Sequence, residues 1–155
     1  YNMQDFIISM GASQGISHGI KKVSKQKVVA FIGDSTFFHA GMPGLANIVY
    51  NKSNPLIIIL DNSITAMTGH QPNPGTGFNA LWQSTDAIKI EDVVRGLGVK
   101  NIAIIDPIEK EKMIATAKEF IEKDEPSVII SRRMCVLYKR KAINSGLIIA
   151  KQERI

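Results

Sequence analysis

Short apolar runs alternate along the chain with segments in which apolar residues recur at helical spacing. The runs predict five strands, at 6–9, 28–32, 55–60, 101–107 and 126–131. The run from 56 to 60 is apolar at every position, which is typical of a strand buried on both faces of a parallel sheet. Strands that alternate with helices indicate a parallel sheet with crossover connections.

Four helices are predicted between these strands, at 12–24, 42–52, 90–98 and 109–123. In the first, Ile16 and Ile20 stand beside Gly15 and Gly19, and small residues at that spacing indicate close packing on a sheet. Ser9 to Gly11 precedes this helix at a strand end, where open parallel sheets bind ligands. The fold class is therefore α/β, with a mainly parallel sheet flanked by helices on both faces.

Residues 62–86 lose periodicity and are rich in Thr, Gly, Asn and Pro. A loop of this length is uncommon in a compact domain unless it is functional or disordered, and its mixed polar and apolar content favours a functional loop. The last part of the chain, 133–155, has no clear pattern and reads as a tail or linker of uncertain structure. The main domain is therefore expected at 1–132, a size that supports a substantial core.

The formal net charge of +5 resides in that tail. Seven Lys and Arg lie from Arg132 onward against the single acid Glu153, whereas the preceding residues hold 12 basic and 13 acidic side chains. A basic end without interleaved aromatic residues is usually solvated surface or a docking arm, so nucleic-acid binding is not expected.

Cys135 is the only cysteine, which excludes an internal disulfide and a four-cysteine metal or iron–sulfur site within this chain. We expect a reducing, cytoplasmic setting. No apolar run approaches the roughly 18 residues of a membrane span, and no leader pattern precedes the first strand. Because the chain begins at Tyr1, we expect it to be a segment of something longer.

Candidate chemistry gathers where two predicted strands end. The strand at 28–32 leads into Gly33-Asp34-Ser35, a tight turn that opens a helix, and the next strand leads to Asn62. Amide groups at such a turn suit a phosphate. A carboxylate, an amide oxygen and a carbonyl just beyond Asn62 suit Mg²⁺, which takes few protein ligands and keeps phosphate oxygens and water.

These motifs resemble a known family. Gly33-Asp34-Ser35, followed after 26 residues by Asn62, resembles the thiamine-diphosphate signature, and Ser9-Met10-Gly11 resembles the Ser-Met-Gly that precedes it. The longer motifs are similar to the alpha subunit of indolepyruvate ferredoxin oxidoreductase, of the 2-oxoacid:ferredoxin oxidoreductase family. They are Met10-Gly11-Ala12-Ser13, Gly33 to Gly41, Thr65-Ala66-Met67-Thr68-Gly69-His70-Gln71-Pro72 and Pro74-Gly75-Thr76-Gly77.

The resemblance implies a thiamine-diphosphate-binding fold and a set of site residues. Asp34, Asn62 and the carbonyl of Ile64 are implied Mg²⁺ ligands. The remaining implied cofactor-binding residues are Ser9, Met10, Gly11, Gly33, Ser35, Thr36, Thr68, Gly69 and Gln71, with the first three beside the aminopyrimidine. His39 and His70 are candidate catalytic residues, and for each a supporting structural role stays open.

The implied activity is oxidative decarboxylation of an aryl 2-oxoacid such as indolepyruvate, with electrons leaving through iron–sulfur clusters to ferredoxin and the acyl group passing to coenzyme A. The pyrimidine-binding domain, which supplies an activating carboxylate, and the cluster domain are expected outside this chain, in an oligomeric enzyme. Two alternatives stay open: a non-oxidative thiamine-dependent 2-oxoacid decarboxylase, and a non-catalytic cofactor- or nucleotide-binding module.

Overall fold

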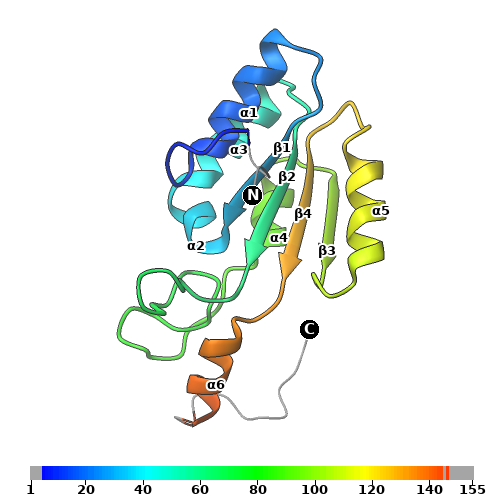
Figure 1. Ribbon diagram of the computed structural model, residues 1–155. Helices are drawn as coiled ribbons and strands as arrows, with labels where there is room; N and C mark the ends of the chain where they lie inside the picture. The colour runs from blue at the N-terminus through cyan, green and yellow to red at the C-terminus, as the bar shows by residue number, and fades with distance from the viewer. Residues whose placement is uncertain (1–4, 145, 147–155) are drawn as a thin grey trace.

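The computed structural model describes residues 5–144 and 146. In this part of the chain a wholly parallel four-stranded sheet has the order β1-β2-β4-β3. Its strands are β1 (Val29–Gly33), β2 (Leu56–Asp61), β3 (Asn101–Ile105) and β4 (Ser127–Arg132). Figure 1 shows the four arrows pointing toward one edge of the sheet. The last four predicted strands are confirmed to within two residues at each end.

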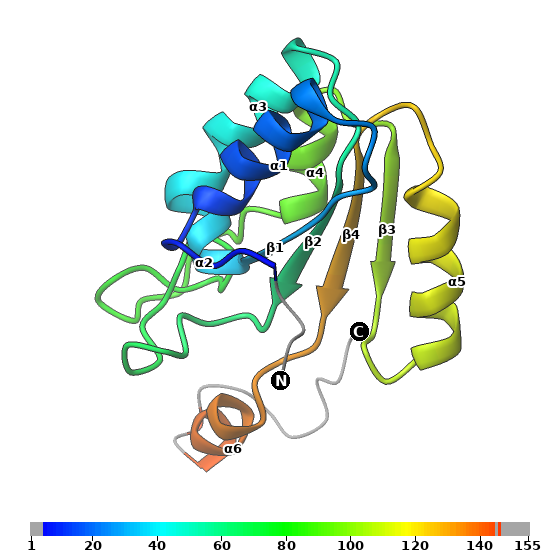
Figure 2. The ribbon, with the colours of Figure 1, turned by 45° about the horizontal axis from the view of Figure 1, so that its top comes forward.

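Helices cover both faces of this sheet, which confirms the predicted α/β class. Figure 2 shows α1 (Ala12–Val23), α3 (Met42–Tyr50) and α4 (Ile90–Gly96) on one face and α5 (Lys110–Phe120) on the other. A further helix, α6 (Val136–Asn144), lies beyond the carboxyl ends of the strands. Each predicted helix is present, and its ends lie within a few residues of the prediction. The helix predicted at 42–52 is the exception, because helical structure begins earlier there.

Strand register determines which side chains meet at the carboxyl edge. Gly33 pairs with Leu60 in the β1–β2 ladder, and Asp61 pairs with Arg132 in the β2–β4 ladder. Asp34 directly follows β1, so it leaves the sheet beside Asp61. The side chains of Asp34, Asp61 and Arg132 therefore meet at the ends of three neighbouring strands, β1, β2 and β4.

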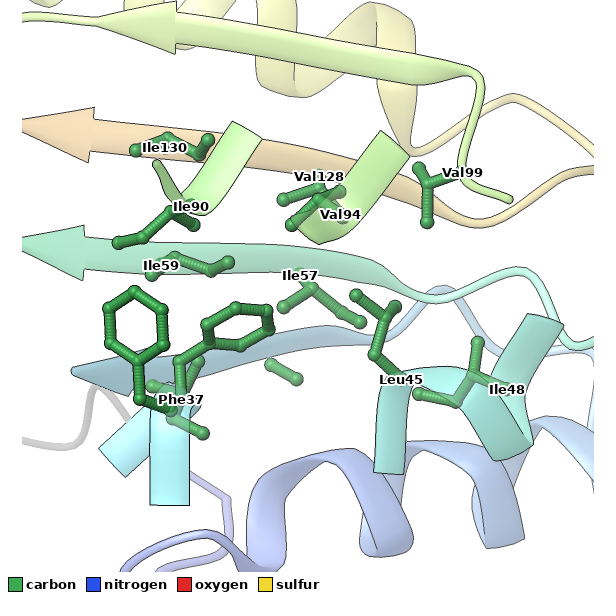
Figure 3. Packing of buried hydrophobic residues seen from close by; sticks show 13 residues of the cluster. Phe37, Leu45, Ile48, Ile57, Ile59, Ile90, Val94, Val99, Val128 and Ile130 are labelled. Atoms are coloured by element: carbon green, nitrogen blue, oxygen red, sulfur yellow. The ribbon is translucent and has the colours of Figure 1, made fainter. Parts of the chain in front are cut away.

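The main core lies between the sheet and the helices α3 and α4. Figure 3 shows Phe37, Leu45 and Ile48 packed toward Ile57 and Ile59 of β2. Full burial of such side chains stabilises the fold by roughly 1.5–3 kcal/mol each. A smaller cluster on the opposite face joins the sheet to α5; its buried members are Leu56, Ile58, Ile105 and Ile129. The continuous apolar run of β2 thus serves both faces.

The strand predicted at 6–9 is wrong. Residues 6–8 have no strand structure, and Phe6, Ile7 and Ile8 are 65%, 82% and 74% exposed. The Ser9 carbonyl already accepts the Ala12 N–H at 3.2 Å, so the segment ends as the turn that begins α1. An apolar run this short becomes a strand only when a neighbouring strand pairs with it.

The helix after β1 begins eight residues earlier than predicted. A first helical turn, α2 (Asp34–Thr36), continues through a π-helical segment, η1 (Phe37–Gly41), into α3. Its sequence lacks helical periodicity because Phe37 and Phe38 are adjacent, yet both are buried. Tertiary packing therefore decides the structure here, and a π-helical turn accommodates the extra residue.

Two other expectations change. Gly15 and Gly19 lie in α1 with open space where a Cβ would stand, so the packing of the described residues does not require glycine there. Residues 136–144 form a helix where the sequence indicated a tail. The boundary at residue 132 stays a prediction. Residues 145 and 147–155 of the basic tail, like the first four residues, lie outside the described residues. No helix in the described ranges is long and apolar enough to cross a membrane.

Candidate functional site

Asp34 is the centre of a buried polar group at the carboxyl edge of the sheet. Its side chain is 5% exposed. One carboxylate oxygen accepts the Ser35 N–H at 2.7 Å, and the other accepts the side-chain amide of Asn73 at 3.3 Å. Burial raises the pKa of Asp34 above its ordinary value, and the nearby charge of Asp61 raises it further, whereas these hydrogen bonds lower it. A desolvated carboxylate next to a second acid is stabilised by a cation.

Asn62 meets Asp34 at the backbone of Ile64. The Ile64 N–H donates to Asn62 Oδ1 at 3.2 Å and lies near enough to the Asp34 carboxylate to lower its pKa. Ile64 itself is fully buried and packs against Tyr138 and Ala142 of α6. Asp34 and Asn62, which follow two of the predicted strands, therefore both lie close to the Ile64 backbone, and α6 packs against Ile64.

The turn that carries Asn62 has its own side-chain support. Asp61 Oδ1 accepts the Ser63 N–H at 3.1 Å, and Asp61 Oδ2 accepts Arg132 Nε–H at 2.6 Å. The two terminal N–H groups of Arg132 donate hydrogen bonds to the carboxylate of Glu91, at 3.2 and 2.6 Å. These hydrogen bonds lower the pKa of Glu91 and raise that of Arg132.

The segment Ser9 to Gly11 packs against the first turns of the helix after β1. Gly11 has a φ of 86°, and a Cβ there would stand 2.8 Å from Ala40 Cβ and 3.7 Å from Thr36 Cγ2. Only glycine permits this approach in this conformation. Met10 beside it is 63% exposed. The structure therefore brings the predicted Ser9–Gly11 and Gly33–Thr36 segments together.

His39 lies in η1 with its ring exposed. Its Nδ1 is 2.9 Å from the carbonyl oxygen of Ser35. A carbonyl only accepts, so Nδ1 carries a proton in this contact. The ring is thus fixed to the helical turn that begins at Asp34.

The turn at 65–71 closes on itself. Thr65 and Gln71 form an antiparallel bridge, the Thr68 hydroxyl donates to Gln71 Oε1 at 2.7 Å, and Gln71 Nε2 donates to the Thr68 carbonyl at 2.7 Å. Gly69 has a φ of 120°. Among the contacts described for this part of the chain, those of Thr68, Gly69 and Gln71 stay within the turn and do not reach Asp34.

His70 points away from that turn toward the chain after β4. It has a φ of 64°, and its Nε2 is 3.8 Å from Cys135 Sγ. The Cys135 N–H donates to the Asn62 carbonyl at 2.9 Å. His70 is therefore linked to the Asn62 turn through Cys135, while His39 is linked to Asp34 through Ser35. The structure attaches the two candidate catalytic histidines to different strand ends.

Sequence reasoning missed Asp61, Asn73, Glu91 and Arg132 as members of this site. With Asp34, they line a cleft of about 230 Å³ together with Phe38, Ser63, Gly75 and residues 87–90. Asp61 and Arg132 could have been found from the sequence, because each is the last residue of a strand in the same parallel sheet. Asn73 and Glu91 had none, because their approach depends on the path of the long loop and of the chain that enters α4.

The residues fit a divalent cation and a diphosphate. The candidate ligands are hard oxygen atoms of a carboxylate, an amide and a carbonyl, which suit Mg²⁺ when phosphate oxygens complete the shell. Within the described ranges, no group of three or more His, Cys, Asp or Glu side chains could hold a metal ion. A Cβ at Gly33 would meet nothing within 4 Å, which leaves room above the helix start.

Comparison with known proteins shows the family to which this chain belongs. Residues 1–131 match the family model described as thiamine pyrophosphate enzyme, C-terminal TPP-binding domain. The chain is 44% identical over 146 residues to indolepyruvate oxidoreductase subunit IorA of Archaeoglobus fulgidus, which covers 94% of this chain and 23% of that protein. The same subunit of Thermococcus kodakarensis is 45% identical over 149 residues, with 87% and 23% covered.

A solved structure shows the same fold. It is 2-oxoglutarate:ferredoxin oxidoreductase from Magnetococcus marinus, with a TM-score of 0.71, 14% identity, and 84% of this chain and 50% of that chain covered. The chain spans about a quarter of the length of the two curated relatives. The resemblance to the indolepyruvate type is confirmed, and the chain belongs to the family of C-terminal thiamine-pyrophosphate-binding domains of thiamine pyrophosphate enzymes.

Proposed function

We propose that this chain is the part of an indolepyruvate-type 2-oxoacid:ferredoxin oxidoreductase that holds the diphosphate end of thiamine diphosphate through Mg²⁺. The observation that carries the proposal is the convergence of Asp34 and Asn62 on the backbone of Ile64. In that arrangement Asp34, Asn62 and the Ile64 carbonyl bind the cation. The backbone N–H groups of Gly33, Ser35 and Thr36 bind the diphosphate at the helix start.

The other predicted site residues have roles around this anchor. Ser9, Met10 and Gly11 border the aminopyrimidine, as the family resemblance implies; the close packing of Gly11 on the helix that begins at Asp34 supports this placement. Thr68, Gly69 and Gln71 form an exposed edge of the site. His39, held by the Ser35 carbonyl near the helix start, contacts substrate, and His70 supports the Asn62 turn through Cys135. The bound cofactor supplies the decarboxylation chemistry.

The rest of the reaction belongs to the longer protein. A pyrimidine-binding domain supplies the activating carboxylate, and a domain or subunit with iron–sulfur clusters passes electrons to ferredoxin. The substrates are an aryl 2-oxoacid such as indolepyruvate and coenzyme A, the product is an acyl-CoA, and the oligomeric enzyme works in the cytoplasm. The printed names of the relatives support the indolepyruvate type, and the fragment alone is expected to be inactive.

Titration of thiamine diphosphate with and without Mg²⁺ tests the proposal. The wild-type subunit should bind only with Mg²⁺, and Asp34→Ala should abolish that binding because it removes the only anionic ligand. The matched control is Asp124→Ala, which changes an exposed aspartate before β4, at the opposite end of the sheet. Binding that ignores Mg²⁺, or equal affinity in Asp34→Ala, would refute the anchor. Ferredoxin reduction that requires indolepyruvate and coenzyme A separates this enzyme from a non-oxidative decarboxylase.

A further inference from the structure

We propose that Arg132 is a positioning residue of the cofactor site, which acts through Asp61 to hold the turn that presents Asn62 and the Ile64 carbonyl. This inference rests on the proposed Mg²⁺ and diphosphate anchor and adds a residue to it. In the described hydrogen bonds, Arg132 contacts neither Asp34 nor Asn62. It acts on the turn at 61–64, which follows β2 and carries Asn62.

The first step is the conformation of the turn itself. Ser63 has a φ of 62°, a left-handed conformation that residues other than glycine rarely adopt. Such a conformation persists only when its surroundings impose it. Asp61 Oδ1 does so by accepting the Ser63 N–H at 3.1 Å, which fixes the direction in which the chain leaves β2.

The second step is the orientation of Asp61. Its other oxygen, Oδ2, accepts Arg132 Nε–H at 2.6 Å, and the Asp61 side chain is only 9% exposed. With one oxygen on Ser63 and the other on Arg132, the carboxylate has a single orientation. Without the guanidinium, this buried carboxylate would lose its cationic partner while it lies beside Asp34.

The third step is the anchoring of Arg132. Both terminal nitrogens bind the carboxylate of Glu91, in the first turn of α4, at 3.2 and 2.6 Å. One guanidinium thus fixes the ends of β2 and β4 and the start of α4 to each other. A planar fork with separate donors can span two carboxylates, whereas a lysine ammonium is a point charge that holds one of them well.

The backbone after Arg132 reinforces the same turn. The Arg133 N–H donates to the Asp61 carbonyl and the Cys135 N–H donates to the Asn62 carbonyl, each at 2.9 Å. The Arg133 side chain turns away and pairs with Asp106 at 2.7 Å, with 47% of its surface exposed. Adjacent arginines therefore differ in role, which offers a matched control.

The test uses the full-length subunit with its partner subunit, stripped of cofactor and titrated with thiamine diphosphate at a series of Mg²⁺ concentrations. Arg132→Met should raise the half-saturating Mg²⁺ concentration by about tenfold or more, the range expected when a group that orients a metal ligand is lost. Arg132→Lys should show a smaller rise, and Arg133→Met should match the wild type. The turnover number at saturating Mg²⁺ and cofactor should change much less than the Mg²⁺ requirement.

A merely structural role would lower the melting temperature without moving the Mg²⁺ requirement. A folded Arg132→Met enzyme with the wild-type Mg²⁺ requirement would therefore overturn the inference. If that variant fails to fold, Arg132→Lys and Glu91→Gln decide in the same way, because an unchanged requirement in both overturns it. Wild-type binding that ignores Mg²⁺ would instead overturn the proposed anchor itself.

Discussion

The side-chain amide of Asn73 donates a hydrogen bond to the carboxylate of Asp34, with 3.3 Å between Nδ2 and Oδ2. The two residues are 39 positions apart, and both are buried. Asn73 also accepts the Gly75 N–H at 2.9 Å through its own oxygen. The long loop is therefore attached to the first turn of the helix after β1, directly at the residue that carries the proposed cation site.

Replacement of Asn73 by alanine should destabilise the chain and weaken cofactor binding. The change removes a buried hydrogen bond to a carboxylate and a part-buried one from the Gly75 N–H, so the free energy of unfolding should fall by roughly 1–3 kcal/mol. Urea unfolding measures this loss. The control Asn47→Ala alters an exposed asparagine of α3 and should change the free energy of unfolding by less than about 0.5 kcal/mol. Equal stability of the two variants would contradict this role of Asn73.

Two glycine-to-alanine changes should act in opposite directions. A Cβ at Gly41 would stand 2.7 Å from Ile32 Cδ1 and 3.0 Å from Phe37 Cδ2, so Gly41→Ala should destabilise by about 1–3 kcal/mol through overpacking. Gly19→Ala, in α1 with open space around it, should stabilise by about 0.5–1 kcal/mol, because alanine favours helix more than glycine does. Thermal unfolding of both variants checks the signs, and a stabilised Gly41→Ala would show that the π-helical turn is loosely packed.

The ion pair between Glu91 and Arg132 should make stability depend on pH. The pKa of Glu91 is lower in the folded chain than its ordinary value because Arg132 binds the carboxylate. The pair's contribution is therefore fully present above the ordinary glutamate pKa of about 4.3 and disappears as pH falls through the lowered folded pKa.

Comparison of wild type with Glu91→Gln isolates that contribution. The wild type should be more stable by roughly 1–3 kcal/mol at neutral pH, the range for hydrogen bonds to charged groups, and the difference should shrink as pH falls below about 4. Urea midpoints at several pH values provide the measurement. A difference that stays constant down to pH 2 would mean that ionised Glu91 is not the source.

Tyr138 should connect α6 to the site. It is 4% exposed, packs on Ile64, and lies 6.3 Å from the ring of Trp82, centroid to centroid. Tyr138→Ala should lower the free energy of unfolding by roughly 3–5 kcal/mol, the cost of emptying a buried aromatic position, and should weaken Mg²⁺-dependent cofactor binding.

The neighbouring Leu137, 67% exposed, provides the control for Tyr138. Leu137→Ala should leave stability within about 0.5 kcal/mol of wild type. If Tyr138→Ala bound cofactor as the wild type does, α6 would be irrelevant to the site and the domain boundary expected at residue 132 would be supported.

Much of the fold was predictable because its signals are local. The unbroken apolar run of β2 and the periodicity of α4 and α5 identify these elements without knowledge of their neighbours. The strand predicted at Phe6–Ser9 is wrong for the opposite reason, because a strand requires a pairing partner and the sequence does not show whether one is present. The helical start at Asp34 was not predicted, because the sequence there has no helical period and burial of Phe37 and Phe38 determines the structure.

The site was predictable only where strand ends define it. Asp34 and Asn62 follow two strands that the sequence predicts, and the structure shows that these strands are adjacent and parallel, so the two residues leave the same edge of the sheet. Asn73 reaches Asp34 through the path of an irregular loop, and Glu91 reaches Arg132 through the placement of α4. Neither path leaves a periodic signal in the sequence, so these two contacts required the three-dimensional structure.

The most direct test of the central claim is a crystal structure of the full-length subunit with thiamine diphosphate and Mn²⁺ in place of Mg²⁺, in which the anomalous signal locates the cation. The account predicts a single peak bound by the Asp34 carboxylate, the Asn62 amide oxygen and the Ile64 carbonyl, with diphosphate oxygens completing the shell. A bound cofactor whose cation lies elsewhere, or whose diphosphate avoids the helix start at Asp34, would contradict it.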